Sequence, residues 1–309
     1  MNEQRPQELY NIYQYQRLRN SVFDRDKLSV PEAMSFGTVR IVANLCDGQA
    51  VGTGFFYNFQ SATENVTPAI ITNKHVIEGA RSLDIIFHVR PWPATTPEMG
   101  MENMLCRIDL VDSPAIPHPS EDVDLCAILT GPLDHRMRAC GIELLYVCSR
   151  SNHMMDEAAE SELQGLDSVV MVGYPNEVWD STNNMPVMRR GVTASHARLD
   201  YEGRKDILLD VGCYPGSSGS PVFWFETGTI INRIENSVAN GWRVRLLGVL
   251  YAAHEYTSEG EIRVVSVPTS SQPVPFTSVP MNLGIAMKSF RVLELEIAVD
   301  RVLLGFPSV

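Results

Sequence analysis

The chain lacks the features that mark membrane, exported and nucleic-acid-binding proteins. No stretch of its 309 residues approaches the roughly 18 consecutive apolar residues that a membrane-spanning helix needs. The first residues, MNEQRPQE, are polar and contain no apolar core of a signal peptide, so a chain that begins at Met1 is expected to stay in the cytoplasm. A net charge of −12 argues against nonspecific nucleic-acid binding, which needs a basic surface.

Paired cysteines at metal-binding spacing are also missing. None of the six cysteines forms a CxxC pair, so we expect no zinc site and no cofactor. An even number of cysteines would permit disulfides. Without a signal peptide, however, we expect reduced and mostly buried thiols. The cysteines are Cys46, Cys106, Cys126, Cys140, Cys148 and Cys213.

What the chain does contain is a long series of short apolar runs separated by turn residues. With 44% hydrophobic and 20% charged residues it can bury a sizeable core, and its length suggests about two domains. Short runs with this spacing predict an all-β fold. The expected strands are 38–43, 51–57, 69–72, 83–87, 123–129, 168–172, 191–194, 207–210, 221–225, 246–251 and 283–287.

Helices are expected in three places outside the strand series. Near-helical spacing of apolar residues within 10–23 predicts a short helix in an N-terminal extension, and a partner-binding arm is the functional alternative there. Residues 151–164 are predicted to form an acidic helical connection. Residues 289–304 are predicted to form a terminal helix, although the alternation within 293–299 would equally suit a strand. The Pro/Ser/Thr-rich segment 266–280 is predicted to form a long loop.

The most informative segment is 213–222, CYPGSSGSPV, which precedes an apolar run. Its glycines allow a tight turn and a close approach of the backbone to a substrate. Such a turn can aim successive N–H groups at one point, where a developing oxyanion would be held. Alone, a Ser/Gly/Pro cluster is more often an ordinary turn, so Ser218 is a candidate nucleophile only if a base and an acid accompany it.

A candidate base and two candidate acids occur earlier in the chain. His75 ends an apolar run in the segment IITNKHV; alone, it would be no more than a polar side chain at a strand end. Asp122 and Asp124 are two residues apart, so on a strand they would face the same side, and periodicity cannot choose between them.

Taken together, the segments VGTGFF, TNKHV, DLCAI and GSSGSP make the chain resemble the trypsin-like, chymotrypsin-fold serine proteases. The HtrA-type branch and related bacterial trypsin-like peptidases are the most similar. The segments GYP at 173–175 and LGIAM at 283–287 extend the resemblance over about 37–289. His75 precedes Asp124 by 49 residues and Asp124 precedes Ser218 by 94, which is the chymotrypsin order.

The resemblance implies a domain plan. It consists of two six-stranded antiparallel β-barrels, with the active site in the cleft between them and short helical extensions at both ends. The expected boundaries are an extension over 1–34, a first barrel over 35–135, a second barrel over 136–289 and a C-terminal segment over 290–309.

The resemblance also implies a function and a set of site residues. The expected activity is that of a serine endopeptidase, with Ser218 as nucleophile, His75 as base and Asp124, chosen over Asp122 by the family pattern, as the acid. The expected oxyanion hole consists of the backbone N–H groups of Gly216 and Ser218. The expected substrate-binding residues are Gly212, Cys213, Tyr251, Ala252 and Ala253.

The expected substrate is a protein or peptide, and neither nucleic acid nor membrane is an expected partner. Because Gly212 is uncharged, a basic side chain before the scissile bond would find no carboxylate, and a small or medium apolar side chain is expected there. His254 offers the alternative of an acidic side chain, although a surface histidine is the simpler interpretation.

Several departures from the family bear on control. Ser217 stands where secreted trypsins carry the Asp that pairs with a newly cut N-terminus, so we expect no activation of that kind. About twenty residues follow Lys288, too few for the PDZ domain of HtrA proteins. A regulatory partner or ligand could take its place, through 1–34 or a loop over 91–118. The alternatives to an active protease are a silent binding module and, less compatible with the order of the triad, an esterase.

Overall fold

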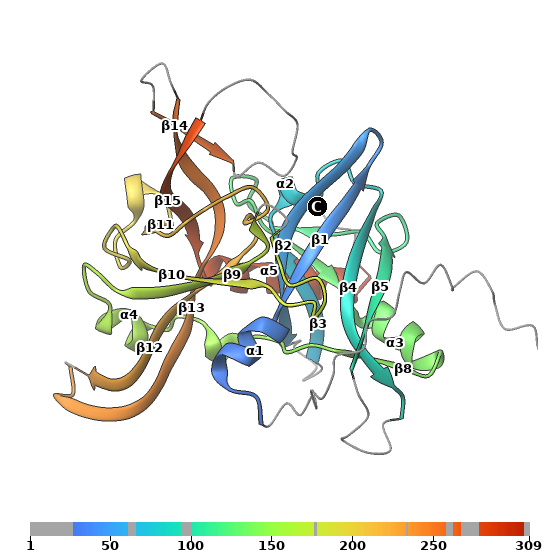
Figure 1. Cartoon of the computed structure of the whole chain (residues 1–309), viewed down its shortest axis with the longest axis horizontal. Helices are drawn as coiled ribbons and strands as arrows, with labels where there is room; N and C mark the ends of the chain where they lie inside the picture. Colours follow the sequence, from blue (N-terminus) through green and yellow to red (C-terminus); the bar gives the residue numbers. More distant parts are fainter. Residues whose placement is uncertain are drawn as a thin grey trace, which may run out of the picture.

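The computed structural model describes residues 27–60, 66–93, 101–175, 178–232, 234–257, 262–266 and 278–305. These residues form mostly β-strands, arranged in two antiparallel sheets with few helices (Figure 1). The predicted helix within 10–23 and most of the predicted loop over 266–280 lie outside the described residues. The mostly β architecture with two antiparallel sheets confirms the expected fold class.

The first sheet is built from the N-terminal half of the chain. Its pairing order is β5-β4-β1-β2-β3-β7-β6, and β8 also pairs with β4. The long hairpin of β1 and β2 supplies its centre, with Thr38 opposite Phe55 and Leu45 opposite Gly48. The strands are β1 (Thr38–Leu45), β2 (Gly48–Gln60), β3 (Val66–Thr72), β4 (Ser82–Pro91), β5 (Glu102–Asp109), β6 (Ile116–Pro117), β7 (Cys126–Leu129) and β8 (Ile142–Leu145).

The second sheet is built from the C-terminal half. Its order is β12-β9-β10-β11-β15-β13-β14, and a further pairing between β12 and β13 joins six of these strands in a ring. The β12–β13 hairpin continues beyond this ring as a curved arm, seen at the lower left of Figure 1. The strands are β9 (Ser168–Gly173), β10 (Val187–Thr193), β11 (Asp206–Asp210), β12 (Pro221–Asn232), β13 (Ser237–Thr257), β14 (Ile262–Ser266) and β15 (Ser278–Lys288).

The helices are short, except for the last one. The N–H of Ser29 donates to the carboxylate of Glu32 at 2.7 Å, which satisfies a free donor at the start of the first helix. The helices are α1 (Val30–Phe36), α2 (Lys74–Ile77), α3 (Gly131–Ala139), α4 (Glu157–Glu162) and α5 (Phe290–Leu303), with 3-10 turns η3 (Ser151–His153) and η5 (Tyr201–Gly203).

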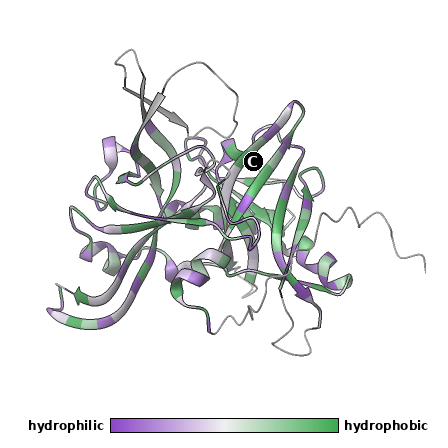
Figure 2. Cartoon of the chain, in the orientation of Figure 1, coloured by the Kyte–Doolittle hydropathy of each residue, from purple (hydrophilic) through white to green (hydrophobic). Residues whose placement is uncertain are grey.

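Each sheet encloses its own hydrophobic core, and a third core joins the two sheets. One core includes Ile41 and Leu83 of the first sheet, and another includes Val169 and Trp224 of the second. The strands around them carry apolar residues that alternate with polar ones, visible as green beside paler segments in Figure 2. Alternation places the apolar side chains on one face of each sheet, and burial of these faces stabilises two sheets with apolar interiors.

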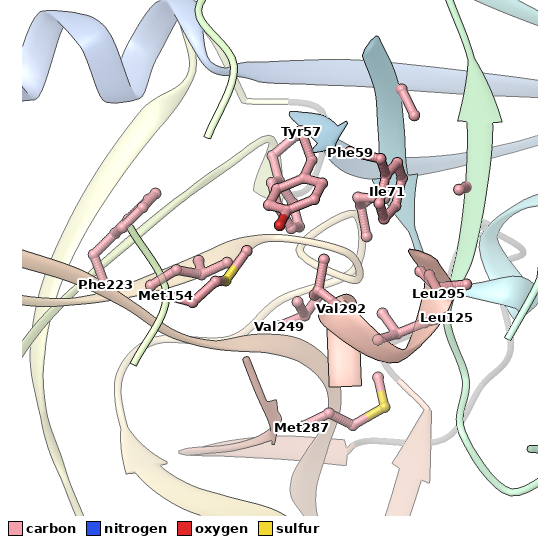
Figure 3. Close-up of a cluster of buried hydrophobic side chains, with 14 of the residues drawn as sticks. Tyr57, Phe59, Ile71, Leu125, Met154, Phe223, Val249, Met287, Val292 and Leu295 are labelled. Atoms are coloured by element: carbon pink, nitrogen blue, oxygen red, sulfur yellow. The ribbon is translucent and has the colours of Figure 1, made fainter. Parts of the chain in front are cut away.

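The joining core forms around α5. The helix contributes the buried side chains Val292, Leu295 and Val299, which pack against residues of both sheets. Figure 3 shows Val292 and Leu295 among Ile71, Leu125, Val249 and Met287. The C-terminal segment is therefore an integral part of the core between the sheets, and its residues 293–299 are helical rather than extended.

The first sheet differs from the six-stranded barrel that the resemblance implied. It contains eight strands, and its order ends at β5 and β6, with no pairing between these two in the described part of the chain. β5 lies inside the predicted loop over 91–118. The predicted strand 123–129 starts only at Cys126, because residues 120–123 form a turn.

The expected boundary between 135 and 136 falls inside α3. The strand after that helix, β8, pairs with β4 of the first sheet. Antiparallel pairing of residues 142–145 with β4 holds this segment on the first sheet. The crossing to the second sheet therefore occurs later, in the segment that contains η3 and α4.

Candidate active site

The segment that contains Ser218 forms a tight turn in front of β12. Gly216 and Gly219 both adopt positive φ angles, 88° and 84°, that favour glycine. The N–H of Ser217 donates to Tyr214 O at 3.0 Å, and the N–H of Ser220 donates to Ser217 O at 3.0 Å. Because the N–H of Ser217 is used inside the turn, the neighbouring N–H groups of Gly216 and Ser218 are the candidate oxyanion donors.

This turn is fastened to both sheets. The N–H of Thr53, in β2 of the first sheet, donates to Ser218 O at 2.8 Å. In the second sheet, the N–H of Gly219 donates to Leu250 O at 2.9 Å and the N–H of Leu250 donates to Ser220 O at 3.0 Å. A Cβ atom at Gly219 would lie less than 3.0 Å from the backbone oxygen of Thr53, so only glycine fits. The turn therefore has a fixed position between the sheets.

Thr53 is a positioning residue that the sequence did not reveal. Its hydroxyl donates to Gly216 O at 2.8 Å and accepts from the N–H of Tyr174 at 3.1 Å. The side chain is fully buried. The sequence motif around 51–56 was recognised, but no rule of spacing indicates that its threonine would hold the carbonyl of a residue 163 positions later.

His75 lies in the short helix α2, directly after β3. Its backbone N–H donates to Asp124 Oδ1 at 3.1 Å, and its Nδ1 is in short contact with Asp124 Oδ2. The Nδ2 group of Asn73 donates to the backbone oxygen of Asp124 at 2.8 Å. Contact with a carboxylate assigns the proton to Nδ1, so Nε2 carries the lone pair that a general base needs.

The two candidate acids have different positions. Asp124 lies just before β7, with its carboxylate against His75, whereas Asp122 is exposed in the preceding turn. Because neither residue lies on a strand, the premise that both face the same side does not apply. The geometry brings His75 together with Asp124 and leaves Asp122 outside.

The loop that carries Asp124 is held by α5 and by α2. The N–H of His118 donates to Leu125 O at 2.9 Å, and His118 Nε2 lies 3.0 Å from Glu294 Oε2 on α5. Burial lowers the pKa of His118, which opposes the effect of Glu294. From α2, Lys74 Nζ donates to Ser120 O at 3.1 Å. These contacts connect the acid to the last helix of the chain.

Ser218 is not hydrogen-bonded to His75 in this structure. Ser218 is fully buried, whereas the side chains of His75 and Asp124 are 18% and 26% exposed. Nε2 of His75 has no hydrogen-bond partner. Catalytic hydrogen bonds are often long in proteins without substrate and tighten when substrate binds.

The five expected substrate-binding residues divide into two groups. Gly212 and Cys213 lead into the turn of Ser218. The Cys213 thiol is buried, donates to Val211 O at 3.2 Å, and has a pKa raised to about 12 by burial. Gly212 lies against Arg189 of β10, because a Cβ atom at Gly212 would collide with Arg189 Nη1. Arg189 was not among the residues selected from the sequence.

Tyr251, Ala252 and Ala253 belong to β13. The pairing of β13 with β15 shifts between Leu250 and Ala252, so Tyr251 sits at an irregularity of the strand. Its hydroxyl donates to Asp206 Oδ2 at 2.8 Å, and burial raises the pKa of both groups. Ala252 and Ala253 are buried on the strand opposite Ile285 and Gly284. The hydroxyl of Tyr251 is thus engaged within the protein.

The family model of the trypsin-like peptidase domain matches residues 52–231, more than half of the chain. The chain belongs to this family. His75, Asp124, Ser218 and Thr53 all lie within the matched range.

Solved protease structures resemble the chain at low identity. An HtrA-type protease with a tripeptide is 13% identical, with a TM-score of 0.46 over 88% of this chain and 64% of its own. The serine endoprotease from Yersinia pestis is 13% identical, with a TM-score of 0.43 over 86% of this chain and 64% of its own. The chain thus spans about 64% of the length of each. No protein with a curated description matches it by sequence.

A tobacco etch virus protease complexed with product is 12% identical to the chain. Its TM-score is 0.39 over 85% of this chain and 91% of its own.

The described residues also bear on membrane-spanning helices, metal sites and disulfides. No helix among them is long and apolar enough to cross a membrane, and no group of three metal-ligating side chains comes together in them. None of the six cysteines, which all lie in the described part of the chain, forms a disulfide; Cys106, Cys126 and Cys213 are buried, whereas Cys46 and Cys140 are exposed. The cytoplasmic location stays a prediction.

Proposed function

We propose that this trypsin-like peptidase domain is a serine endopeptidase that uses Ser218, His75 and Asp124. The observation that carries the proposal is the double contact of the Asp124 carboxylate with the backbone N–H and Nδ1 of His75. It fixes the orientation and tautomer of the imidazole and directs a lone pair away from the carboxylate. The turn of Ser218, fastened to both sheets, supplies the matching nucleophile.

In the proposed reaction, Ser218 Oγ attacks the carbonyl carbon of the scissile peptide bond while His75 Nε2 takes its proton. The tetrahedral oxyanion accepts hydrogen bonds from the N–H groups of Gly216 and Ser218. The C–N bond breaks as His75 returns the proton to the leaving amine, which leaves an acyl-enzyme. A water molecule, deprotonated by His75, then attacks the acyl carbon and releases Ser218 with its proton.

The proposed enzyme is not activated by a cut in the manner of trypsin. Ser217 is buried, and its hydroxyl accepts from the N–H of Tyr214 at 3.4 Å, so it offers no carboxylate to a new N-terminus. Because His75 Nε2 has no hydrogen-bond partner, the proposed reaction includes a movement on substrate binding that brings Nε2 and Ser218 Oγ into hydrogen-bond contact. A substrate, ligand or protein partner that favours this movement would control the enzyme.

The same burial of Ser218 favours one alternative, a silent binding module that keeps the fold without turnover. Labelling with a fluorophosphonate probe separates the two. We expect the wild-type protein to be labelled and to cleave an unfolded protein substrate, and Ser218→Ala to do neither while keeping its fold. Ser220→Ala is the matched control, because Ser220 is equally buried in the same turn and its hydroxyl has no partner.

Labelling and cleavage that persist in Ser218→Ala would overturn the assignment of the nucleophile. A folded wild-type protein that is neither labelled nor active with unfolded, native and peptide substrates would support the silent module. Circular dichroism of each variant verifies that the fold is intact.

A further inference from the structure

Arg189 places a cation beside the segment that leads into the turn of Ser218. The residue lies on β10 and is half-buried. Its guanidinium lies over the ring of Tyr214, 4.6 Å from the ring centroid, and its Nη1 occupies the space that a side chain at Gly212 would need. The absence of a side chain at Gly212 therefore provides room for this cation.

This cation has no anionic counterpart in the part of the chain that the structure describes. No ion pair or hydrogen bond of Arg189 is formed there, and its Nε is buried without a partner. Cys213, on the same segment, has a thiol pKa that burial raises to about 12, so it is neutral near pH 7 and supplies no counter-charge. A partly buried guanidinium without a carboxylate is costly, and an anion that enters from outside would offset that cost.

Arg189 contacts the turn at which the scissile bond of a substrate would lie. The N–H of Ser217 donates to Tyr214 O, and the N–H of Tyr214 donates to Ser217 Oγ at 3.4 Å, so Tyr214 is part of the turn that presents Gly216 and Ser218. The substrate side chain attached next to the scissile carbonyl must lie close to this turn. A carboxylate at the end of that side chain would find in Arg189 a fork of N–H donors suited to bidentate pairing.

We propose that Arg189 is the residue that determines specificity, by selecting an aspartate or glutamate directly before the scissile bond. The inference rests on the proposed endopeptidase activity and assigns the substrate class to that site. It replaces the small or medium apolar side chain expected from an uncharged Gly212, because the charge is supplied by a neighbouring strand rather than by residue 212 itself.

The test compares fluorogenic peptides that differ only in the residue before the scissile bond, with Glu, Gln, Leu or Lys at that position. We expect wild-type kcat/KM to favour Glu over the isosteric Gln by roughly 10- to 100-fold, as for a charge-assisted hydrogen bond. Arg189→Gln should reduce this ratio to near one, and Arg189→Lys should restore part of it. The preference should weaken at high ionic strength.

Arg190→Gln is the matched control. Arg190 is the next residue on the same strand, is exposed, and faces the opposite side of the sheet, so the Glu/Gln ratio should stay at its wild-type value. Circular dichroism and the urea midpoint of Arg189→Gln verify that the fold is intact without the cation over Tyr214.

The outcomes separate the two proposals. A wild-type protein that is labelled and cleaves peptides, but shows no preference for Glu or a preference unchanged in Arg189→Gln, overturns the role of Arg189 and leaves the endopeptidase standing. A wild-type protein that is neither labelled nor active overturns both.

Discussion

Asp124 and Asp122, which periodicity alone leaves as equal candidates, occupy different positions in the structure. Asp122 and Asp124 have the same chemistry and nearly the same sequence position, yet only Asp124 contacts His75. The difference arises because the turn over 120–123 exposes Asp122 to solvent, while the extended residues before β7 bring Asp124 to α2. The side chain of Asn73 fastens this arrangement through the backbone oxygen of Asp124.

We predict that Asp124→Asn lowers kcat/KM by about four orders of magnitude, because an amide no longer holds the tautomer and charge of His75. Asp122→Asn should change kcat/KM by no more than about twofold, as expected for an exposed carboxylate. Steady-state hydrolysis of one peptide substrate by the two variants measures both effects. A larger loss in Asp122→Asn would move the acid to that residue.

Two elements position the site: the turn between Gly216 and Ser220, and helix α5. The turn requires a backbone conformation at Gly219 that combines a positive φ with close approach to Thr53. Helix α5 fills the space between the sheets and contacts the loop of Asp124 through Glu294 and His118. The site is thus supported from both sides by elements distant in sequence.

Gly219→Ala should unfold or severely destabilise the protein, by about 4 kcal/mol or more, because the added Cβ meets backbone atoms. Gly203→Ala is the control for the φ angle alone: Gly203 has a φ of 75° and open space around it, so about 1 to 2 kcal/mol should be lost. Urea denaturation gives both values. If Gly219→Ala and Gly203→Ala lose the same unfolding free energy, the clash of the added Cβ with Thr53 is not the cause.

For helix α5, Leu295→Ala should lower the free energy of unfolding by about 2 to 5 kcal/mol, because Leu295 is 0% exposed in the core that joins the sheets. Ile297→Ala, on the same helix but 66% exposed, should change it by less than about 0.5 kcal/mol. Urea denaturation measures both variants, and their midpoints are compared where the m value, the slope of unfolding free energy against urea concentration, is the same. Two variants of similar stability would mean that α5 is not part of the core.

At the scale of the whole molecule, pH affects stability through a buried histidine of the first sheet. Burial lowers the pKa of His88 from 6.5 to about 4. Because the unfolded chain binds a proton at higher pH than the folded protein, stability is full above about pH 6.5 and is lost as the pH falls toward 4. The loss from this group over that range is about 3 kcal/mol.

His88→Gln should therefore flatten the dependence of unfolding free energy on pH between 6.5 and 4. His135→Gln should not alter that dependence, because His135 is exposed. Urea denaturation at pH 7 and pH 4.5 provides the measurement. If the change in unfolding free energy between pH 7 and pH 4.5 is the same in His88→Gln as in the wild type, other groups cause the loss of stability in acid.

Much of the strand pattern could be predicted from local sequence, and the misses have specific reasons. Met104, Cys106 and Ile108 in β5 alternate with more exposed residues, so a period of two was present but was obscured by the loop-like residues before it. β8 has only four residues, too few to show a period, and its pairing with β4 could not be predicted from local sequence. The terminal helix could not be separated from a strand until its apolar side packed between the sheets.

The sequence by itself determined the family, the mostly β fold and the identity of the candidate nucleophile and base, because short-range signals carry them: alternation of apolar residues, glycines at tight turns, and residue order. Tertiary structure decided the contact of Asp124 with His75, the support from Thr53 and α5, the burial of Ser218 and the position of Arg189 beside Gly212. These depend on contacts between residues far apart in the chain, such as Thr53 with Gly216 and Arg189 with Tyr214, whose partners no local pattern encodes.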